Sequence, residues 1–306
     1  MRAAVVGVGH LGQHHARILA SLPGISLAGV VDLNRERASK IASDHGTTAF
    51  GEVGEIQDLD LVVIATPTLS HSAIALPLIE SGVHTLIEKP VAQTLAEADE
   101  LIAAARKSGA VLAVGHSERF NPAVAAARPY VNDPRFIEVH RLGTQLGRSL
   151  DIDVVLDLMI HDLDLILSMV RSEVESVEAV GVPVLTPKVD IANARVRFKN
   201  GCIANLTASR ISRDQIRKIR FFQRERYVSI DTAAREVEMY QLVPQPAGLP
   251  KIDGGKLTVP GDEPLKRELE DFVDAVRTKR APGVTGEDGL RALRLATRVA
   301  EAVEAG

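Results

Sequence analysis

The stretch "AAVVGVGHLGQHHARIL", residues 3–19, decides the fold of the first half of the chain. Its first residues form an apolar run typical of a buried strand, and its second half has apolar residues at helical spacing. Gly7, Gly9 and Gly12 lie between them in a GxGxxG pattern. In such a unit the first glycine allows a tight turn, the second lets a ligand approach the main chain, and the third lets helix and strand pack closely. The stretch therefore predicts a dinucleotide site, with the pyrophosphate on free N–H groups at the helix start.

The pattern continues through the first hundred residues. Further apolar runs rich in Val, Ile and Leu are "SLAGVVD" (26–32), "LDLVVIATP" (59–67), "HTLIEKP" (84–90) and "AVLAVGH" (110–116). Amphipathic stretches of helical length separate them. Apolar strands that alternate with helices indicate a parallel sheet covered on both faces, so we predict an α/β, doubly wound Rossmann domain over residues 1–118.

Asp32 ends the second predicted strand, 20 residues after Gly12. A carboxylate at this place can accept hydrogen bonds from the ribose hydroxyls of an adenosine, and it repels a 2′-phosphate. We therefore expect NAD rather than NADP as cofactor. Arg35 and Arg37 follow closely enough to keep NADP as the alternative.

Composition excludes several other classes of protein. The chain has 306 residues, of which 45% are hydrophobic and 25% charged, with a formal net charge of −4. This is an ordinary globular composition that gives no support for nucleic-acid or membrane binding. The single cysteine, Cys202, forms no intrachain disulfide and reads as a small buried hydrophobe. With no apolar run near membrane-spanning length and no signal-like leader, we expect a cytoplasmic protein.

A second informative stretch, "LDLMIHDLDL" (156–165), places an imidazole among carboxylates in an apolar run. In a helix, Asp157 and His161 lie one turn apart on one face, whereas Asp164 lies about 10.5 Å along the axis from Asp157. One ion with ligand bonds near 2 Å does not readily join both ends, so we expect no metal here. An acid–base pair with a partner elsewhere and a core helix with mutually satisfied polar groups remain open.

The fourth predicted strand ends in "IEKPVA", residues 87–92. Ligands of doubly wound sheets lie off the carboxyl ends of the strands, so Lys89 is a candidate contact of a nicotinamide ring. Pro90 stiffens the turn that follows the lysine.

Taken together, the motifs resemble the glucose–fructose oxidoreductase/inositol dehydrogenase (Gfo/Idh/MocA) family. The resemblance is carried by "GVGHLG" (7–12), "ATPTLSH" (65–71), "EKP" (88–90), "ERFNP" (118–122) and "DLMIHDLD" (157–164), in order along the whole chain. It implies an active site lined by Lys89, Asp157 and His161. It also implies cofactor contacts from the glycine turn, Asp32 and the loops after two further strands, namely Gly7, Gly9, His10, Leu11, Gly12, Asp32, Thr66, Pro67, His71, Glu88 and Lys89.

Lys89, Asp157 and His161 suit the loss of hydride from a carbinol carbon, a reaction in which the hydroxyl proton must also leave. His161 can take that proton near neutral pH, and Asp157 can orient the imidazole. Lys89 can stabilise the oxygen on which negative charge develops. The lysine and histidine roles can be exchanged. Met159 stands where many family members have a small residue, and we expect it to narrow the substrate side.

Residues 119–306 predict a second, α+β domain. Its runs alternate like strands with one covered face, and "KNG" (199–201) is a good hairpin turn, so we expect a mostly antiparallel open sheet carrying the 151–170 helix. The exposed sheet face is a candidate surface for a homodimer or homotetramer, an assembly that the resemblance also implies. Two amphipathic helices end the chain.

The substrate is expected to be a sugar or nucleotide sugar. Arg210 and Arg119 are candidate ligands of an anionic group, with Asn121 beside them, because guanidinium forks match phosphate oxygens. With "ERFNP" and "DLMIHDLD", this resembles the nucleotide-sugar branch, whose members oxidise the 3-hydroxyl of UDP-N-acetylglucosamine. The alternatives are a dehydrogenase of free polyols or monosaccharides, a hydrolase that uses NAD transiently, and a regulatory NAD-binding protein without catalysis.

Overall fold

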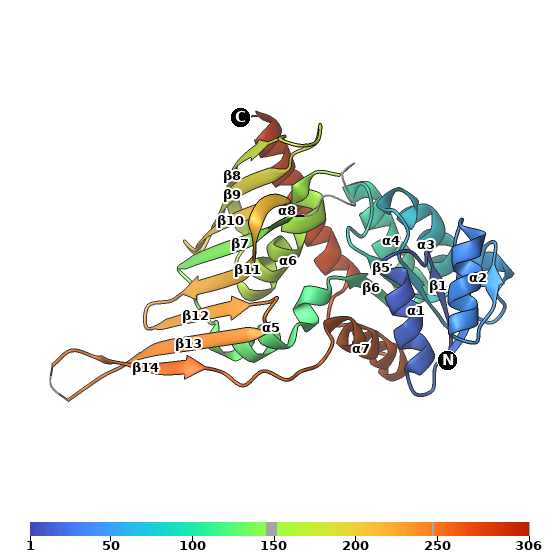
Figure 1. The fold of residues 1–306 in the computed structure, drawn as a ribbon, viewed down its shortest axis with the longest axis horizontal. Helices are drawn as coiled ribbons and strands as arrows, with labels where there is room; N and C mark the ends of the chain where they lie inside the picture. Colours follow the sequence, from blue (N-terminus) through green and yellow to red (C-terminus); the bar gives the residue numbers. More distant parts are fainter. Residues whose placement is uncertain (145–151, 247, 306) are drawn as a thin grey trace. The chain divides into compact units, whose positions relative to one another are not determined.

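The computed structural model describes residues 1–144, 152–246 and 248–305, which form two compact units (Figure 1). The first unit comprises Met1–Ser117 and Pro264–Leu290, and the second comprises Glu118–Glu263 and Arg291–Gly306. The expected boundary after residue 118 assigned the segment 264–290 to the second domain. In the structure this segment groups with the first unit.

The first unit is built on a six-stranded sheet with the order β3-β2-β1-β4-β5-β6. All neighbouring strands are parallel. The strands are β1 (Arg2–Val6), β2 (Ser26–Val31), β3 (Ala49–Phe50), β4 (Leu61–Ile64), β5 (His84–Glu88) and β6 (Leu112–Gly115). This order, with crossover helices between the strands, confirms the predicted doubly wound Rossmann sheet.

Helices cover this sheet, and their ends follow local sequence signals. They are α1 (Gly12–Ser21), α2 (Arg35–Asp44), α3 (His71–Glu80), α4 (Leu95–Ser108) and α7 (Pro264–Thr278), with short turns η1 (Val53–Glu55) and η2 (Thr68–Ser70). For example, α4 starts at a capping box of Thr94 and Glu97 and ends at Gly109 in the left-handed region. Leu269 and Phe272 of α7 are buried in the same apolar cluster as Ile18 and Leu19 of α1. This packing explains why the segment 264–290 belongs to the first unit.

The second unit contains an eight-stranded sheet with the order β14-β13-β12-β11-β7-β10-β9-β8. Its neighbours are antiparallel except for the parallel pair β7 and β10, which confirms the predicted mostly antiparallel sheet. The strands are β7 (Phe136–Thr144), β8 (Val174–Val182), β9 (Ile191–Phe198), β10 (Ile203–Ser209), β11 (Ile211–Phe222), β12 (Arg226–Asp231), β13 (Glu236–Val243) and β14 (Lys251–Lys256). The predicted "KNG" hairpin joins β9 to β10, with Gly201 at a φ of 85°.

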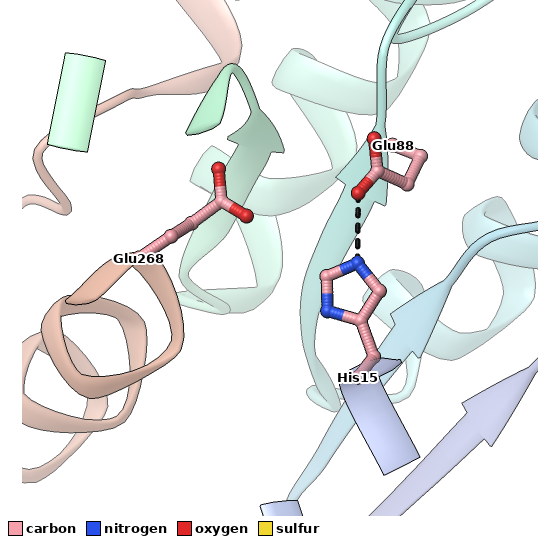
Figure 2. A group of neighbouring side chains, drawn as sticks. All are labelled: His15, Glu88 and Glu268. Carbon is pink, nitrogen blue, oxygen red and sulfur yellow. Dashed lines mark hydrogen bonds and ion pairs between the residues drawn. The ribbon is translucent and has the colours of Figure 1, made fainter. Parts of the chain in front are cut away.

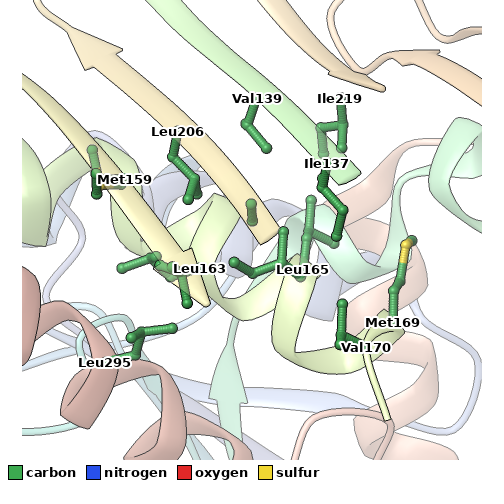
Figure 3. Close-up of a cluster of buried hydrophobic side chains, with 14 of the residues drawn as sticks. Ile137, Val139, Met159, Leu163, Leu165, Met169, Val170, Leu206, Ile219 and Leu295 are labelled. Carbon is green, nitrogen blue, oxygen red and sulfur yellow. The ribbon is translucent and has the colours of Figure 1, made fainter. Parts of the chain in front are cut away.

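One face of the second sheet carries the core of this unit (Figure 3). Helices here are α5 (Pro122–Ala127), α6 (Ile160–Met169) and the later part of α8 (Gly286–Ala305), with the turns η3 (Ser117–Phe120), η4 (Arg128–Tyr130) and the π-helical η5 (Val155–Met159). Leu163 and Leu165 of α6 are buried in one cluster with Ile137 and Leu206 of the sheet.

Two single residues of this core test sequence expectations. Met159 is fully buried in the apolar cluster, so it acts as a packing residue there, and a narrowing of the substrate side by Met159 stays a prediction. Cys202 is also fully buried, as predicted, and burial raises the pKa of its thiol to about 11. Among the described residues, no helix is both long and apolar enough to cross a membrane.

Candidate active site

The glycine turn between β1 and α1 has the geometry that a dinucleotide requires. A Cβ on Gly7, whose φ is +84°, would lie 2.7 Å from the carbonyl oxygen of Ala65, and a Cβ on Gly12 would lie 1.7 Å from that of Gly7. A Cβ on Gly9 would meet nothing within 4 Å. Gly7 and Gly12 are thus required by the chain itself, whereas Gly9 borders open space, as the predicted approach of a pyrophosphate to the main chain requires.

The start of α1 is free to receive an anion. No side chain caps this helix, and its first turn has no acidic residue, so the positive end of the helix dipole is not neutralised locally. His10 and Leu11 are exposed in the turn itself, and Leu11 is 40% exposed. These observations fit the predicted contacts of both residues with a cofactor.

Asp32 follows β2 and is held firmly in place. Its carboxylate accepts hydrogen bonds from the N–H groups of Val8 (2.9 Å) and Asn34 (2.8 Å), and from Arg37 through both Nε (3.0 Å) and Nη2 (2.7 Å). Burial opposes ionisation of Asp32, but the hydrogen bonds from Arg37, Asn34 and Val8 outweigh it and lower the pKa of this carboxyl. A buried, ionised carboxylate therefore stands at the predicted ribose position, with an arginine directly beside it.

The loops after β4 and β5 are joined by a single imidazole. His71 is 1% exposed, and its Nδ1 and Nε2 lie 2.9 Å from the carbonyl oxygens of Pro90 and Thr66, respectively. Burial lowers the pKa of His71. The hydroxyl oxygen of Ser70 lies 2.8 Å both from Thr66 Oγ1 and from the carbonyl oxygen of Pro67, so its proton can be donated to either. His71 thus braces two cofactor-side loops against each other, and direct cofactor contacts of His71, Thr66 and Pro67 stay predictions.

Lys89 follows the end of β5 in a turn that Glu88 anchors. The Lys89 N–H donates to Glu88 Oε2 at 3.2 Å, and Glu88 Oε1 lies 2.7 Å from Nε2 of the buried His15. Glu88 is 6% exposed, whereas Lys89 is half-buried. The buried carboxylate of Glu88 therefore fixes the position of the main chain at Lys89.

In the second unit, the polar stretch 156–165 contains a π-helical turn followed by α6. Asp153 starts it by accepting hydrogen bonds from the N–H groups of Val155 and Leu156, both at 2.9 Å. The chain between Asp157 in η5 and His161 in α6 is thus not a regular α-helix as expected, and such π-turns are frequent at functional sites. Asp157 and His161 are half-buried.

The other two acidic residues of the stretch are buried and paired with arginines. Arg141 donates to both oxygens of Asp162 at 2.8 Å and to Glu118 at 3.2 Å. Arg119 donates to both oxygens of Asp164, at 2.7 and 2.6 Å. Asp164 therefore braces the fold. Burial by itself would lower the pKa of the Arg141 guanidinium, but the charges of Asp162 and Glu118 raise it.

Arg119, Asn121 and Arg210, the three predicted substrate contacts, each interact with other residues of the protein. Besides the Arg119 pair, Asn121 caps α5 by accepting from the Ala123 N–H (3.0 Å) and donates to the Thr232 carbonyl (3.0 Å). Arg210 is 1% exposed; it donates to the carbonyl of Ile152 and lies 3.6 Å from Asp190. Direct contact with substrate stays a prediction for all three, and it would have to coexist with these internal bonds.

Sequence reasoning missed the partners of this helix. Arg141 was not singled out, although Ile137, Val139 and Arg141 occupy alternate, inward positions of β7. A charged residue at an inward position of a strand indicates a buried partner, and that signal could have been used. Lys89 belongs to the first unit and Asp157 and His161 to the second, so their meeting at one carbinol also stays a prediction.

Comparison with known proteins agrees with these features. The model of an oxidoreductase family with an NAD-binding Rossmann fold, Gfo/Idh/MocA, matches residues 1–116, and the model of the Gfo/Idh/MocA C-terminal domain matches residues 137–225. The chain belongs to the Gfo/Idh/MocA family. The resemblance seen in the motifs is therefore confirmed, and with it a nicotinamide-dependent oxidoreductase fold.

Individual Gfo/Idh/MocA proteins are similar to different degrees. UDP-N-acetylglucosamine 3-dehydrogenase of Acidithiobacillus ferrooxidans is 41% identical over 311 residues, which cover 100% of this chain and 98% of that protein. A solved structure of it superimposes with a TM-score of 0.93 over the same shares of both chains. The NAD-dependent scyllo-inositol 2-dehydrogenase of Bacillus subtilis is 29% identical over 238 residues, 69% of this chain and 68% of that protein. Levoglucosan dehydrogenase with NADH, at 19% identity and a TM-score of 0.87 over 100% of this chain and 97% of that one, shares the fold.

Proposed function

We propose that this protein is a dehydrogenase that moves a hydride between C3 of a UDP-N-acetylhexosamine and a nicotinamide cofactor. The observation that carries the proposal is the 41% identity, over the full length of both chains, to UDP-N-acetylglucosamine 3-dehydrogenase. The residues expected to do the chemistry are Lys89, Asp157 and His161.

In the proposed reaction the bound nicotinamide ring supplies the hydride acceptor, and the protein handles the proton and the charge. His161 accepts the proton of the reacting hydroxyl, because an imidazole titrates near neutral pH. Asp157, which precedes it by one turn of the polar segment, orients the ring and stabilises the imidazolium. The Lys89 ammonium stabilises the developing negative charge on the oxygen, which contributes a few kcal/mol in a dry site. The reverse assignment of lysine and histidine is chemically equivalent.

A substrate panel tests the proposal. Purified protein is mixed with NAD or NADP and with UDP-N-acetylglucosamine, UDP-N-acetylgalactosamine, myo-inositol or glucose, and reduced cofactor is followed at 340 nm. We expect turnover with a UDP-N-acetylhexosamine. Turnover of a free polyol with no activity on any UDP-sugar would reject the proposal and assign the protein to the polyol dehydrogenases. Cofactor binding without turnover of any substrate would favour a regulatory protein.

The cofactor proposed for this reaction is NAD. Asp32 supports it, because an ionised carboxylate at the ribose position repels a 2′-phosphate. Arg37, which bonds this carboxylate, is the group that NADP would recruit. We expect Asp32→Ala to change the ratio of kcat/KM for NAD over NADP by about tenfold toward NADP, since one unfavourable charge contact is removed. An unchanged ratio would reject the assignment.

We also propose that copies of the chain associate through the outer face of the second sheet into a homodimer or homotetramer. Cross-strand aromatic residues form a row there, with ring centroids 5.5 Å apart for Phe136–Phe222, 5.2 Å for Phe222–Tyr227 and 6.4 Å for Tyr227–Tyr240. Phe222, Tyr240 and Leu242 are 37%, 36% and 42% exposed. Exposed apolar patches of this kind are typical of interfaces. Light scattering of the wild type and of Phe222→Glu tests this, and a monomeric wild type would reject it.

A further inference from the structure

Three buried side chains of the first unit converge behind the Lys89 turn (Figure 2). His15 comes from α1, Glu88 from the end of β5 and Glu268 from α7, and they are 0%, 6% and 2% exposed. Each offers one nitrogen or oxygen atom, and these atoms all lie within 4.8 Å of one another. We call these three residues the His15 cluster.

Glu268 is the member of the His15 cluster that the protein leaves unsatisfied. Its carboxylate is directed toward His15 and Glu88 (Figure 2), and neither of its oxygens has a hydrogen-bond partner among the described residues. The Nδ1 atom of His15 likewise has no such partner there. A buried carboxylate costs several kcal/mol unless a proton or a cation neutralises it. Burial raises the pKa of Glu268 well above its usual range, and the charges of Glu88 and Asp271 raise it further.

We propose that the His15 cluster binds one divalent ion of the first transition row, with zinc as the best fit. Two carboxylates and a neutral imidazole balance the charge of a 2+ ion, which removes the repulsion between Glu88 and Glu268. Ligand bonds near 2.1 Å place two donors of a tetrahedral ion about 3.4 Å apart. For an ion to bind, the 2.7 Å contact of His15 with Glu88 has to widen, and any pair of donors farther apart has to approach through side-chain shifts. The imidazole nitrogen disfavours calcium and magnesium, which prefer oxygen ligands.

Gly115 leaves the space that the carboxylate of Glu88, one of the three proposed ligands, occupies. A Cβ on Gly115, the residue paired with Glu88 across β5 and β6, would lie 2.8 Å from the Glu88 carboxylate. The missing side chain lets this carboxylate lie over the end of β6. Because the Lys89 N–H donates to Glu88, an ion here would fix the main chain at the proposed catalytic lysine. It would also link α1, which follows the glycine turn of the proposed cofactor site, to helix α7.

Metal binding to the full chain tests the proposal independently of catalysis. The protein is dialysed against a chelator, desalted and titrated with Zn²⁺, Co²⁺ or Mn²⁺. Bound metal is then measured by mass spectrometry, and Tm is measured with and without zinc. We expect one zinc per chain, a higher Tm with zinc, and intense visible absorption of a four-coordinate Co²⁺ complex.

Two variants of α7 locate the ion. Glu268→Gln should weaken zinc binding at least a hundredfold and abolish the zinc-dependent rise in Tm, while its Tm in chelator stays near that of the wild type. Glu270→Gln, which changes an exposed residue of the same helix, should bind zinc like the wild type.

Several outcomes would overturn the proposal. A wild type that retains well under one metal per chain, with no change of Tm for any of the three ions, would show that Glu268 is neutralised by a proton. Equal losses in both variants would indicate surface binding. If Glu268→Gln does not fold, the wild-type stoichiometry and cobalt spectrum decide, because a weakly absorbing six-coordinate spectrum does not fit this donor set.

Discussion

The glycine turn before α1 and the polar segment η5–α6 both place polar groups in apolar surroundings, but with different chemistry. In the turn the proposed functional groups are main-chain N–H groups. Two of the three glycines are required by close approaches, Gly12 to the carbonyl of Gly7 and Gly7 to that of Ala65 at the neighbouring strand end. In the polar segment they are side chains whose partners lie far away in the sequence. Arg141 and Arg119 precede the acids that they bind by 21 and 45 residues. A main-chain site can therefore be recognised locally, whereas a side-chain site needs the fold.

The polar segment is itself divided. Asp162 and Asp164 are 2% and 1% exposed and form two-pronged ion pairs, so they serve the fold. Asp157 and His161 are half-buried, and they are the residues of this segment for which we propose a catalytic role. The alternative of a core helix with mutually satisfied polar groups thus applies to Asp162 and Asp164, whereas the acid–base pair stays a prediction for Asp157 and His161.

The largest expected effect concerns the proposed catalytic pair. Lys89→Ala and His161→Ala should each lower kcat by about 10²–10⁴-fold, because each removes a group that acts in the transition state. Dissociation constants for NAD, measured by fluorescence titration, should change little. Lys107→Ala, at an exposed lysine of α4, serves as the control. Near-normal kcat in either variant would remove that residue from the mechanism.

The second effect separates the two kinds of acid in the polar segment. Asp162→Asn should lower the free energy of unfolding by about 3 kcal/mol, because Arg141 loses a buried charge partner and keeps only Glu118. Asp157→Asn should leave Tm nearly unchanged and lower kcat. Denaturant unfolding and initial rates measure both quantities on both variants. If Asp157→Asn destabilised the protein as much as Asp162→Asn, Asp157 would be a structural residue too.

The same division explains what could be predicted from the sequence. The parallel sheet, its glycine turn and the ribose-side Asp32 follow from patterns of residues close in sequence, and the structure has them. The mostly antiparallel sheet follows from strand alternation and the hairpin at Gly201. Each of these depends on local periodicity or on a backbone requirement.

The rest depends on contacts that sequence does not show. Helix α7 joins the first unit because Leu269 and Phe272 pack into its core. An amphipathic pattern does not say against what a helix packs. The π-turn at 155–159 and the arginine partners of Asp162 and Asp164 were not foreseen for the same reason. The His15 cluster likewise combines three segments that are distant along the chain.

A third, smaller effect tests whether Gly12 is required for folding and Gly9 for the binding of the cofactor. Gly12→Ala should lower the free energy of unfolding by about 2–3 kcal/mol, because the new Cβ collides with the carbonyl of Gly7. Gly9→Ala should keep the wild-type Tm, because no protein atom lies within 4 Å of its Cβ. Both variants should bind NAD poorly. Normal NAD binding by Gly9→Ala would show that the pyrophosphate does not lie against Gly9.

The smallest effect concerns Asp190, whose carboxylate is bound by main-chain N–H groups as a pyrophosphate would be at the glycine turn. In the second unit the Asp190 carboxylate accepts hydrogen bonds from the N–H groups of Val184, Leu185 and Thr186, at 2.7–2.9 Å, as a phosphate does at a helix start. Burial of Asp190 opposes its ionisation, but these bonds and the Thr186 hydroxyl lower its pKa to about 2. The bound form is the charged one, so the stabilisation is present above the ordinary aspartate pKa and is lost as the pH falls toward 2.

Asp190→Asn makes this pH dependence measurable. At pH 7 the variant should be less stable than the wild type by about 1–2 kcal/mol, because an amide oxygen is a weaker acceptor than a carboxylate and the buried Arg210 guanidinium, 3.6 Å away, loses an opposite charge. The difference should shrink between about pH 4 and pH 2, because the wild-type group becomes protonated there. Urea unfolding at several pH values in this range gives the comparison. A difference that stays constant with pH would mean that packing, and not the charge of Asp190, holds the loop.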